Sequence, residues 1–311
     1  MKGPALLLAG IGLFGTLDAN SKLLSGHYSV GQAIALRYVV LLLLFLAVQA
    51  AKPGALGPVA AVRPFAHLAR ALCMMVSAAG FFLGFRRLPL AEGYLVFFSA
   101  PLFTLGLCAV LLGERAPRAA WAWCGAGFAG VLLAVAPKLG GGGSLPGYLS
   151  VLVGTLAFAL TQTLNRALRA EAGIARILLW PSLMGVLVYG PLAARDWVGP
   201  PPGELIQLLA NGIFAGAAVV CTAAAYKYAD AARLGPFGFA ALPVSVLFDG
   251  VLWGHPPDPF TLAGGAVVIA ACVMSERARR RQGISEGKAW VPSGASGSGV
   301  TPRTAESGSG P

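Results

Sequence analysis

The sequence predicts an all-α integral membrane protein, in which ten transmembrane helices form two inverted five-helix repeats around a central cavity. Three observations predict this fold: the composition, a series of apolar runs, and a similarity between the two halves. Of the 311 residues, 57% are hydrophobic and 11% are charged, whereas soluble domains carry about 25% charged residues. So few charged side chains cannot cover a soluble surface, and we expect most side chains to face lipid or other helices.

Ten apolar runs, separated by short connections, are each long enough to cross a bilayer as a helix, for which about 20 residues are needed. The third run is the least regular, because Arg70 lies inside it. The expected spans are residues 5–24, 31–50, 68–85, 91–111, 120–136, 148–168, 174–192, 205–228, 234–252 and 260–274.

The fourth span lies within residues 88–115, which read LPLAEGYLVFFSAPLFTLGLCAVLLGER, and Pro101 lies near its middle. Proline removes a backbone donor and kinks or breaks a helix. Membranes tolerate this where neighbouring helices or a cavity satisfy the freed carbonyl group. A weaker copy of this design covers residues 229–254, with Pro243 at its centre. Paired interrupted spans in the two halves of a chain indicate a substrate pathway between them.

The two halves resemble each other at a nearly constant shift. A shift of 144 positions places Phe14, Asp18 and Lys22 on Phe158, Gln162 and Arg166; a shift of 141 places Phe85 and Arg86 on Tyr226 and Lys227; a shift of 142 places Pro101 on Pro243. Five helices in each copy make the second copy enter the membrane from the opposite side. The sequence therefore predicts inverted repeats, with a shared cavity near the midplane.

These boundaries divide the chain into four parts. We expect a first repeat at residues 1–137, a linker at 138–147, a second repeat at 148–275, and a disordered cytoplasmic tail at 276–311. The linker contains four consecutive glycines, and the tail is rich in Gly, Ser and Pro. Neither segment has enough apolar residues to form a packed unit of its own.

Most Lys and Arg residues between the spans fall on the even-numbered connections and at the two ends, which share one face if the chain crosses ten times. The opposite face carries only Lys22, Arg86, Arg87, Lys138 and Arg195. The positive-inside rule then places both termini in the cytoplasm, and we expect a bacterial-type inner membrane. Binding of nucleic acid is not expected, because the basic residues lie between apolar runs and do not form a patch interleaved with aromatic residues.

The cysteines and histidines do not form a pattern that would bind a metal or catalyse a reaction. All five cysteines lie inside apolar runs without CxxC spacing, and the three histidines lie at the ends of runs or in loops. We interpret the cysteines as small buried hydrophobic residues. We therefore expect no metal, no cofactor and no catalytic residues. A membrane-embedded enzyme, the alternative, would need clustered His, Asp or Glu at one membrane face.

Ionisable residues inside spans are costly and are candidates for function. Asp18 and Arg37 lie at similar depths in the first two spans, about 9 Å from their shared end at 1.5 Å per residue. They can pair, and Lys22, one turn beyond Asp18, is a competing partner. Either the pair only fixes the hairpin, or it borders an outer gate and holds a substrate carboxylate or ammonium. Asp249, in the outer half of the ninth span, is a candidate to carry a coupling proton.

Aromatic and polar residues near the two central prolines predict a cavity for an amphipathic solute, with an aromatic wall and a few hydrogen-bonding groups. A single hydroxyl can equally bond to its own helix, so the prediction depends on the group as a whole. The expected cavity residues are Tyr94, Ser99, Pro101, Gln162, Asn165, Trp180, Phe237, Phe239 and Pro243.

The pattern LPLAEG…APLF…LLGER, followed by a glycine-rich span at Gly125–Gly130, resembles the EamA branch of the drug/metabolite transporter superfamily, and within it the amino-acid and aromatic amino-acid exporters. The resemblance covers residues 6–274. It implies a ten-helix basket with a central cavity and export of amino acids or related metabolites. The second half departs from the pattern, because residues 254–256 read Gly-His-Pro where the first half has Gly-Glu-Arg.

We therefore expect a carrier that exports aromatic and other amino acids by rocking of its two halves. Its partners are a small-molecule substrate and the lipid bilayer, and no oligomer is required. A carrier for S-adenosylmethionine or another larger metabolite is the alternative within transport. That alternative calls for more basic residues facing the cavity than the one or two that the sequence places there.

Overall fold

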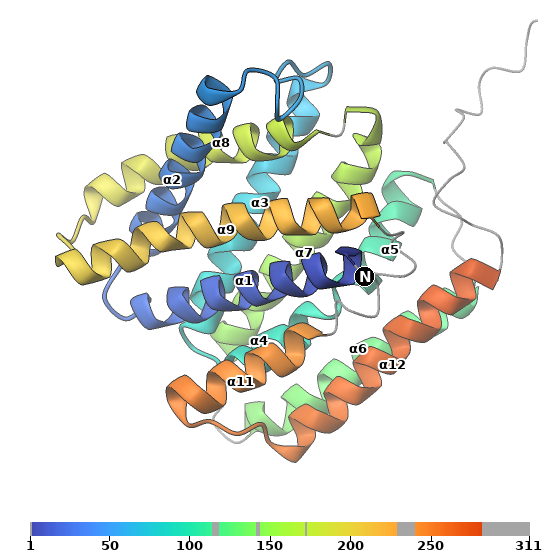
Figure 1. Ribbon diagram of the computed structural model, residues 1–311. Coiled ribbons are helices and arrows are strands. Elements are labelled where there is room, and N and C mark those ends of the chain that lie inside the picture. The colour runs from blue at the N-terminus through green and yellow to red at the C-terminus, as the bar shows by residue number, and fades with distance from the viewer. Residues whose placement is uncertain (1, 114–117, 141–143, 172, 229–239, 282–311) are drawn as a thin grey trace, which may run out of the picture.

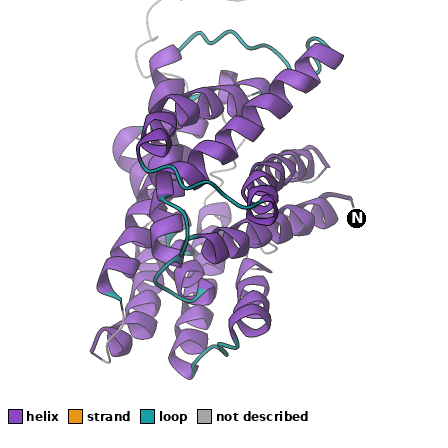
Figure 2. Ribbon diagram, turned by 90° about the vertical axis from the view of Figure 1, so that its left-hand side faces the viewer, coloured by secondary structure: helices purple, strands orange, loops and turns teal. Residues whose placement is uncertain are grey.

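The computed structural model describes residues 2–113, 118–140, 144–171, 173–228 and 240–281, which form helices and short loops without a β-strand (Figure 2). The predicted all-α class is confirmed. The helices are α1 (Lys2–Leu24), α2 (Val30–Ala51), α3 (Pro64–Phe85), α4 (Leu90–Phe97), α5 (Ala100–Leu111), α6 (Arg118–Gly140), α7 (Leu145–Ala167), the 3-10 helix η1 (Arg169–Glu171), α8 (Ile174–Arg195), α9 (Pro202–Tyr228), α11 (Ala241–Trp253) and α12 (Pro259–Arg281).

Six stretches are long and apolar enough to cross a membrane: α2, α3, α4 together with α5, α7, α8, and α9 as far as Ala225. Shorter apolar stretches lie in α6, α11 and α12. The first expected span is helical as α1. The fourth expected span thus corresponds to two helices, α4 and α5, and eight of the other spans each correspond to one helix. Of the ninth, only the part from residue 240 onward lies within the described residues.

The fourth span is broken beside Pro101, as predicted. α4 ends at Phe97 and α5 begins at Ala100, so Pro101 occupies the first turn of α5, where its missing N–H is not needed. The Ser99 hydroxyl donates to the carbonyl oxygen of Val96 at 2.6 Å and satisfies one carbonyl at the end of α4. Pro243 likewise lies in the first turn of α11.

The predicted linker and tail differ from the structure. α6 continues through Pro137 to Gly140, and α7 begins at Leu145. Both ends of the expected linker at 138–147 are therefore helical, and residues 141–143 lie outside the described residues. α12 continues to Arg281, so the first residues of the expected tail are helical. The rest of the tail, residues 282–311, lies outside the residues that the structure describes.

The most extensive helix contacts join the two halves of the chain. α6 packs on α12, α3 on α7, α1 on α9 and α2 on α8. Figure 1 shows α12 lying along α6 at one edge of the molecule and α9 lying beside α1. The interface between the halves therefore runs through the whole bundle.

Glycine allows α3 and α7 to cross closely. A Cβ atom at Gly80 would lie 2.6 Å from the carbonyl oxygen of Ser150, and one at Gly154 would lie 3.1 Å from the carbonyl oxygen of Ser77 and 3.2 Å from the nitrogen of Phe81. These neighbours are backbone atoms, which cannot move aside as a side chain can. Small residues at such crossings let membrane helices pack through backbone contacts.

The crossing of α1 and α9 uses equivalent residues. A Cβ atom at Gly10 would lie 3.3 Å from the carbonyl oxygen of Ala218 and 3.4 Å from the nitrogen of Thr222. Gly10 is the residue that a shift of 144 assigns to Gly154. A shift of 141 assigns its two contacts, Ala218 and Thr222, to Ser77 and Phe81, which are the residues of α3 that Gly154 contacts. The same offsets that relate the two halves in sequence therefore relate these two helix crossings.

Candidate functional site

Asp249 of α11 joins the two halves at the start of α4. Its side chain is buried, and its carboxylate accepts hydrogen bonds from the backbone N–H groups of Leu90 at 2.9 Å and Ala91 at 2.7 Å. The first N–H groups of a helix have no partner within the helix, and this end of the helix dipole is positive. A carboxylate from the other half therefore completes the N-terminus of α4.

Lys22 of α1 provides the cation for this carboxylate. Its Nζ lies 3.3 Å from Asp249 Oδ1 and 4.3 Å from the ring centroid of Trp253. An ammonium group in an apolar surrounding is stabilised by both an anion and an aromatic face. Sequence reasoning named both charged residues but did not pair them, because they are separated by 227 positions and no local pattern connects them.

Asp18 and Tyr94, predicted for the gate and the cavity, are in contact. The Tyr94 hydroxyl donates to Asp18 Oδ2 at 2.6 Å. The Tyr94 ring stacks on Phe85 with centroids 5.7 Å apart and meets Phe97 edge-on at 6.1 Å. Phe97 in turn packs against Phe158 of α7 at 5.1 Å. These residues form an aromatic cluster that spans α3, α4 and α7, with one carboxylate at its edge.

The expected ion pair between Asp18 and Arg37 is not formed. The guanidinium of Arg37 donates to the Ser21 hydroxyl at 3.1 Å, and the same oxygen accepts from the amide of Asn211 at 3.4 Å. Equal depth in a helical hairpin was not enough to predict the pair, because Arg37 bonds to Ser21 of α1 and Asp18 bonds to Tyr94 of α4. The cation is therefore held where α1, α2 and α9 meet.

A second polar cluster lies at the opposite end of the bundle, and sequence reasoning missed its central residue. Arg70 is 2% exposed, so it is a buried residue of α3 and not a topology signal on a loop. Its guanidinium donates to Asn165 Oδ1 at 3.2 Å and to the carbonyl oxygen of Arg176 at 2.8 Å. The amide of Asn165 donates to Gln162 at 3.0 Å. Two predicted cavity residues of α7 thus lie in this cluster.

His67 and Glu171 extend this cluster toward the loops. His67 stacks on Trp180, the predicted residue of α8, with centroids 5.9 Å apart, and its Nε2 lies 3.3 Å from Glu171 Oε2. Burial raises the pKa of Glu171, but hydrogen bonds from the backbone N–H groups of Val62 and Arg63 and from His67 lower it by more, so this pKa lies below its ordinary value.

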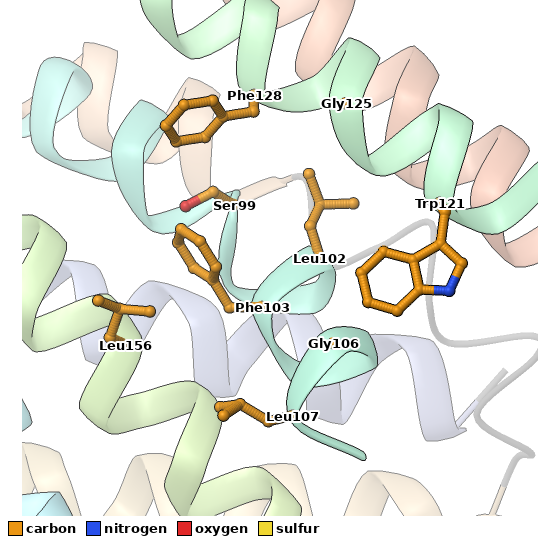
Figure 3. Close-up of a pocket in the computed structure, with 9 residues that line it drawn as sticks. All are labelled: Ser99, Leu102, Phe103, Gly106, Leu107, Trp121, Gly125, Phe128 and Leu156. Carbon is orange, nitrogen blue, oxygen red and sulfur yellow. The ribbon is translucent and has the colours of Figure 1, made fainter. Parts of the chain in front are cut away.

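An apolar pocket of about 500 Å³ lies between α5, α6 and α7 (Figure 3). Phe103 and Phe128 meet edge-on with ring centroids 6.4 Å apart, and several lining side chains, Trp121 among them, are exposed. Exposed apolar side chains on membrane helices face lipid, so the pocket lies at the side of the bundle. Its lining residues are Ser99, Leu102, Phe103, Gly106, Leu107, Trp121, Gly125, Phe128 and Leu156.

The structure therefore divides the expected cavity residues among several places. Ser99 lines the pocket, Tyr94 belongs to the aromatic cluster, and Gln162, Asn165 and Trp180 lie in the cluster around Arg70. Both prolines, Pro101 and Pro243, are exposed in the first turns of α5 and α11. The two remaining residues, Phe237 and Phe239, lie outside the described residues.

Apolar helices of membrane-spanning length, with ionisable side chains buried where the two halves of the chain meet, define a multi-pass membrane protein of the carrier type. Residues 145–276 match the model of the EamA-like transporter family. A solved crystal structure shares the fold with a TM-score of 0.63 at 20% identity, over 90% of this chain and 98% of that one.

Three curated relatives are transporters. The chain is 25% identical to an S-adenosylmethionine uptake transporter of Rickettsia conorii, over 67% of this chain and 70% of the relative. It is 27% identical to a riboflavin transporter of Rhizobium johnstonii (70% and 72%) and 25% identical to a pseudopaline exporter of Pseudomonas aeruginosa (64% and 70%). The chain is a membrane transporter, residues 145–276 form an EamA-like domain, and the resemblance to this family is confirmed.

Proposed function

We propose that the protein is an alternating-access carrier for amino acids and metabolites that contain an amino-acid group, and that it works in the bacterial inner membrane. The observation that carries this proposal is the equivalence of the helix contacts in the two halves. In the repeat, α1, α2, α3 and α6 correspond to α7, α8, α9 and α12. If each helix is replaced by its counterpart, the packed pair α1 and α9 becomes the packed pair α7 and α3, and the packed pairs α2 with α8 and α6 with α12 stay the same.

The direction of the helices supports inversion of the repeats, at residues 1–137 and 148–275. Gly84 of α3 contacts Gly147, whereas Gly80 contacts Gly154, so α3 and α7 run antiparallel. Short connections make α1 and α3 parallel, and α1 and its equivalent α7 therefore run in opposite directions. Inverted halves of this kind exchange roles when the cavity between them opens to one side and then to the other.

The contacts of Asp249 and Lys22 supply a closed gate in this proposal. They hold α11 of the second half against α1 and α4 of the first, next to the loops that join α1 to α2 and α3 to α4. A rocking movement that opens this end must break the ion pair or release the N-terminus of α4. The positive-inside rule makes this the outer end and leaves both termini in the cytoplasm.

For the substrate, the aromatic cluster supplies an apolar wall, and Asp18 supplies a carboxylate for an ammonium group. Amino acids fit both features. S-adenosylmethionine, named for the relatives from Rickettsia, also carries an amino-acid group and is the second candidate. The relatives include both an uptake protein and an exporter, so the substrate class does not determine the direction of transport. Export is the direction that we propose.

Counterflow in proteoliposomes tests the proposal. Vesicles with the purified protein are loaded with unlabelled phenylalanine, leucine or S-adenosylmethionine, and uptake of the same labelled compound is followed with and without a pH gradient. We expect uptake above that of protein-free vesicles for at least one amino-acid compound. Riboflavin is the comparison compound. Counterflow of riboflavin alone would overturn the proposed substrate class, but the protein would still be a carrier.

A further inference from the structure

Two buried guanidinium groups lie near opposite ends of the interface between the halves. Arg37 is 8% exposed and Arg70 is 2% exposed. Each lies about 10 Å from the first residue of its helix, at about 1.5 Å per residue, and α2 and α3 start from opposite ends of the bundle. Both are linked to the second half of the chain: Arg70 bonds directly to Asn165 of α7, and Arg37 donates to the Ser21 hydroxyl that also accepts from Asn211 of α9.

The internal repeat relates the surroundings of these two groups. Arg70 donates to Asn165 at 3.2 Å, and Asn211 donates to Ser21 at 3.4 Å. The shifts of 141 and 144 that relate the halves place Arg70 on Asn211 and Ser21 on Asn165. The two contacts are therefore equivalent, and Arg37 donates to the same Ser21. Each end of the interface thus has one guanidinium at an equivalent helix crossing.

Neither guanidinium has all of its donors satisfied. The Nε atom of Arg37 and the Nε atom of Arg70 are both buried without a hydrogen-bond partner among the residues that the structure describes. The indole nitrogen of Trp180, beside the Arg70 cluster, is also buried without one. A buried donor without an acceptor costs free energy, so three donors at this interface point to an acceptor that the chain does not supply.

The neighbouring carboxylates make no direct bond to either guanidinium. Asp18 accepts from Tyr94 and acts on Arg37 only through its charge, beyond ion-pair distance. Glu171 accepts from the backbone of Val62 and from His67. In the described part of the chain, the contacts within 4 Å between basic and acidic side chains join Lys22 to Asp249 and, as ion pairs only when the imidazole is protonated, His27 to Glu204 and His67 to Glu171. Neither buried arginine takes part in such a contact. An arginine inside a membrane protein is normally paired, so these two are available for an anion from outside.

We propose that Arg37 and Arg70 are two alternating binding stations for the carboxylate of the transported substrate. The planar guanidinium binds a carboxylate through two parallel hydrogen bonds, and Nε is one of the donors that such a pair uses. The substrate carboxylate binds Arg37 when the cavity opens at the end of α1 and Arg70 when it opens at the other end. This inference rests on the proposed carrier function and adds the chemical group that both stations recognise.

Pairs of probes that differ only in the carboxylate test this inference. They are phenylalanine with phenethylamine, and S-adenosylmethionine with its decarboxylated form. We expect the carboxylates to inhibit counterflow at concentrations at least tenfold below those of their decarboxylated partners. Equal inhibition within each pair would overturn the carboxylate stations but not the carrier. Absence of counterflow with every probe would overturn the proposed function itself.

Sided kinetics separate binding from a structural role. In vesicles with one protein orientation, R37Q should raise the half-saturating concentration at one face by at least tenfold, and R70Q should do so at the opposite face. R86Q, on an exposed loop residue, is the matched control. If a Gln variant does not fold, the corresponding Lys variant keeps the charge but loses the planar fork and is measured instead. An equal change at both faces for both variants would overturn the inference.

Discussion

At the scale of single residues, the site consists of buried polar contacts between helices, and some of these contacts can be changed without changing the shape of the side chain. Asp18 is one example, because asparagine has the same shape but no charge. The hydroxyl of Tyr94 donates to this carboxylate at 2.6 Å, and it can still donate to an amide oxygen. Loss of charge and loss of packing are therefore separable here.

We predict that Asp18→Asn preserves folding but reduces transport. Hydrogen bonds to charged groups are stronger than those to neutral groups by about 1 kcal/mol, so the free energy of unfolding should fall by roughly that amount. Counterflow should fall by about tenfold or more if the carboxylate binds a substrate ammonium. Asp196→Asn, at an exposed position, is the control. Loss of monodisperse protein in size-exclusion chromatography would instead make Asp18 a structural residue.

The contact between Lys22 and Asp249 allows a double-mutant cycle. We predict that Lys22→Gln and Asp249→Asn each destabilise the protein, and that the double variant loses less than the sum of the two. The expected coupling is about 1–3 kcal/mol, as for residues in one buried network. Thermal unfolding in detergent measures it. Strictly additive losses would show that the two groups do not interact and would remove this pair from the proposed gate.

At the scale of helices, much of the fold could be predicted from the sequence, because hydrophobic runs of about 20 residues specify spans directly. The break at Pro101 could also be predicted, since proline acts on its own helix. Contacts between distant helices could not. Arg37 was expected to pair with Asp18 but bonds to Ser21, and the partners of Arg70 were not predicted. The reason is that the rotation of a helix about its axis depends on packing and not on local sequence.

The crossing of α3 and α7 provides the prediction at this scale. A Cβ atom at Gly80 would lie 2.6 Å from a backbone oxygen of α7, so we expect Gly80→Ala to push the helices apart and to lower the unfolding free energy by about 1–3 kcal/mol. Gly12→Ala, in a helix position with nothing within 4 Å, is the matched control.

In the control, the higher helix propensity of alanine should leave stability unchanged or raise it by up to about 1 kcal/mol. Thermal unfolding of both purified variants measures the loss of stability from the clash at Gly80 against the effect of helix propensity at Gly12. If Gly80→Ala were as stable as Gly12→Ala, the backbone contact at this crossing would not support the packing of α3 on α7.

At the scale of the whole molecule, the proposal of inverted halves determines which loops share a face. The loop between α1 and α2 must lie on one side of the membrane, and the loop between α2 and α3 on the other. Gly26 and Ala55 are exposed residues of these two loops, and a Cβ atom at Gly26 meets nothing within 4 Å. Both positions therefore accept a reactive side chain without disturbing the fold.

We predict that Gly26→Cys, but not Ala55→Cys, reacts with a membrane-impermeant maleimide in intact cells, after the five native cysteines have been replaced by alanine. Ala55→Cys should react once the membrane is permeabilised. This pattern is expected because the positive-inside rule places the loop after α2, which carries Lys52 and Arg63, in the cytoplasm. The reverse pattern would mean that the protein has the opposite orientation in the membrane, with the gate of Asp249 and Lys22 at the cytoplasmic face. Reaction of both residues in intact cells would be incompatible with a membrane-spanning α2 and with the two-sided carrier built on it.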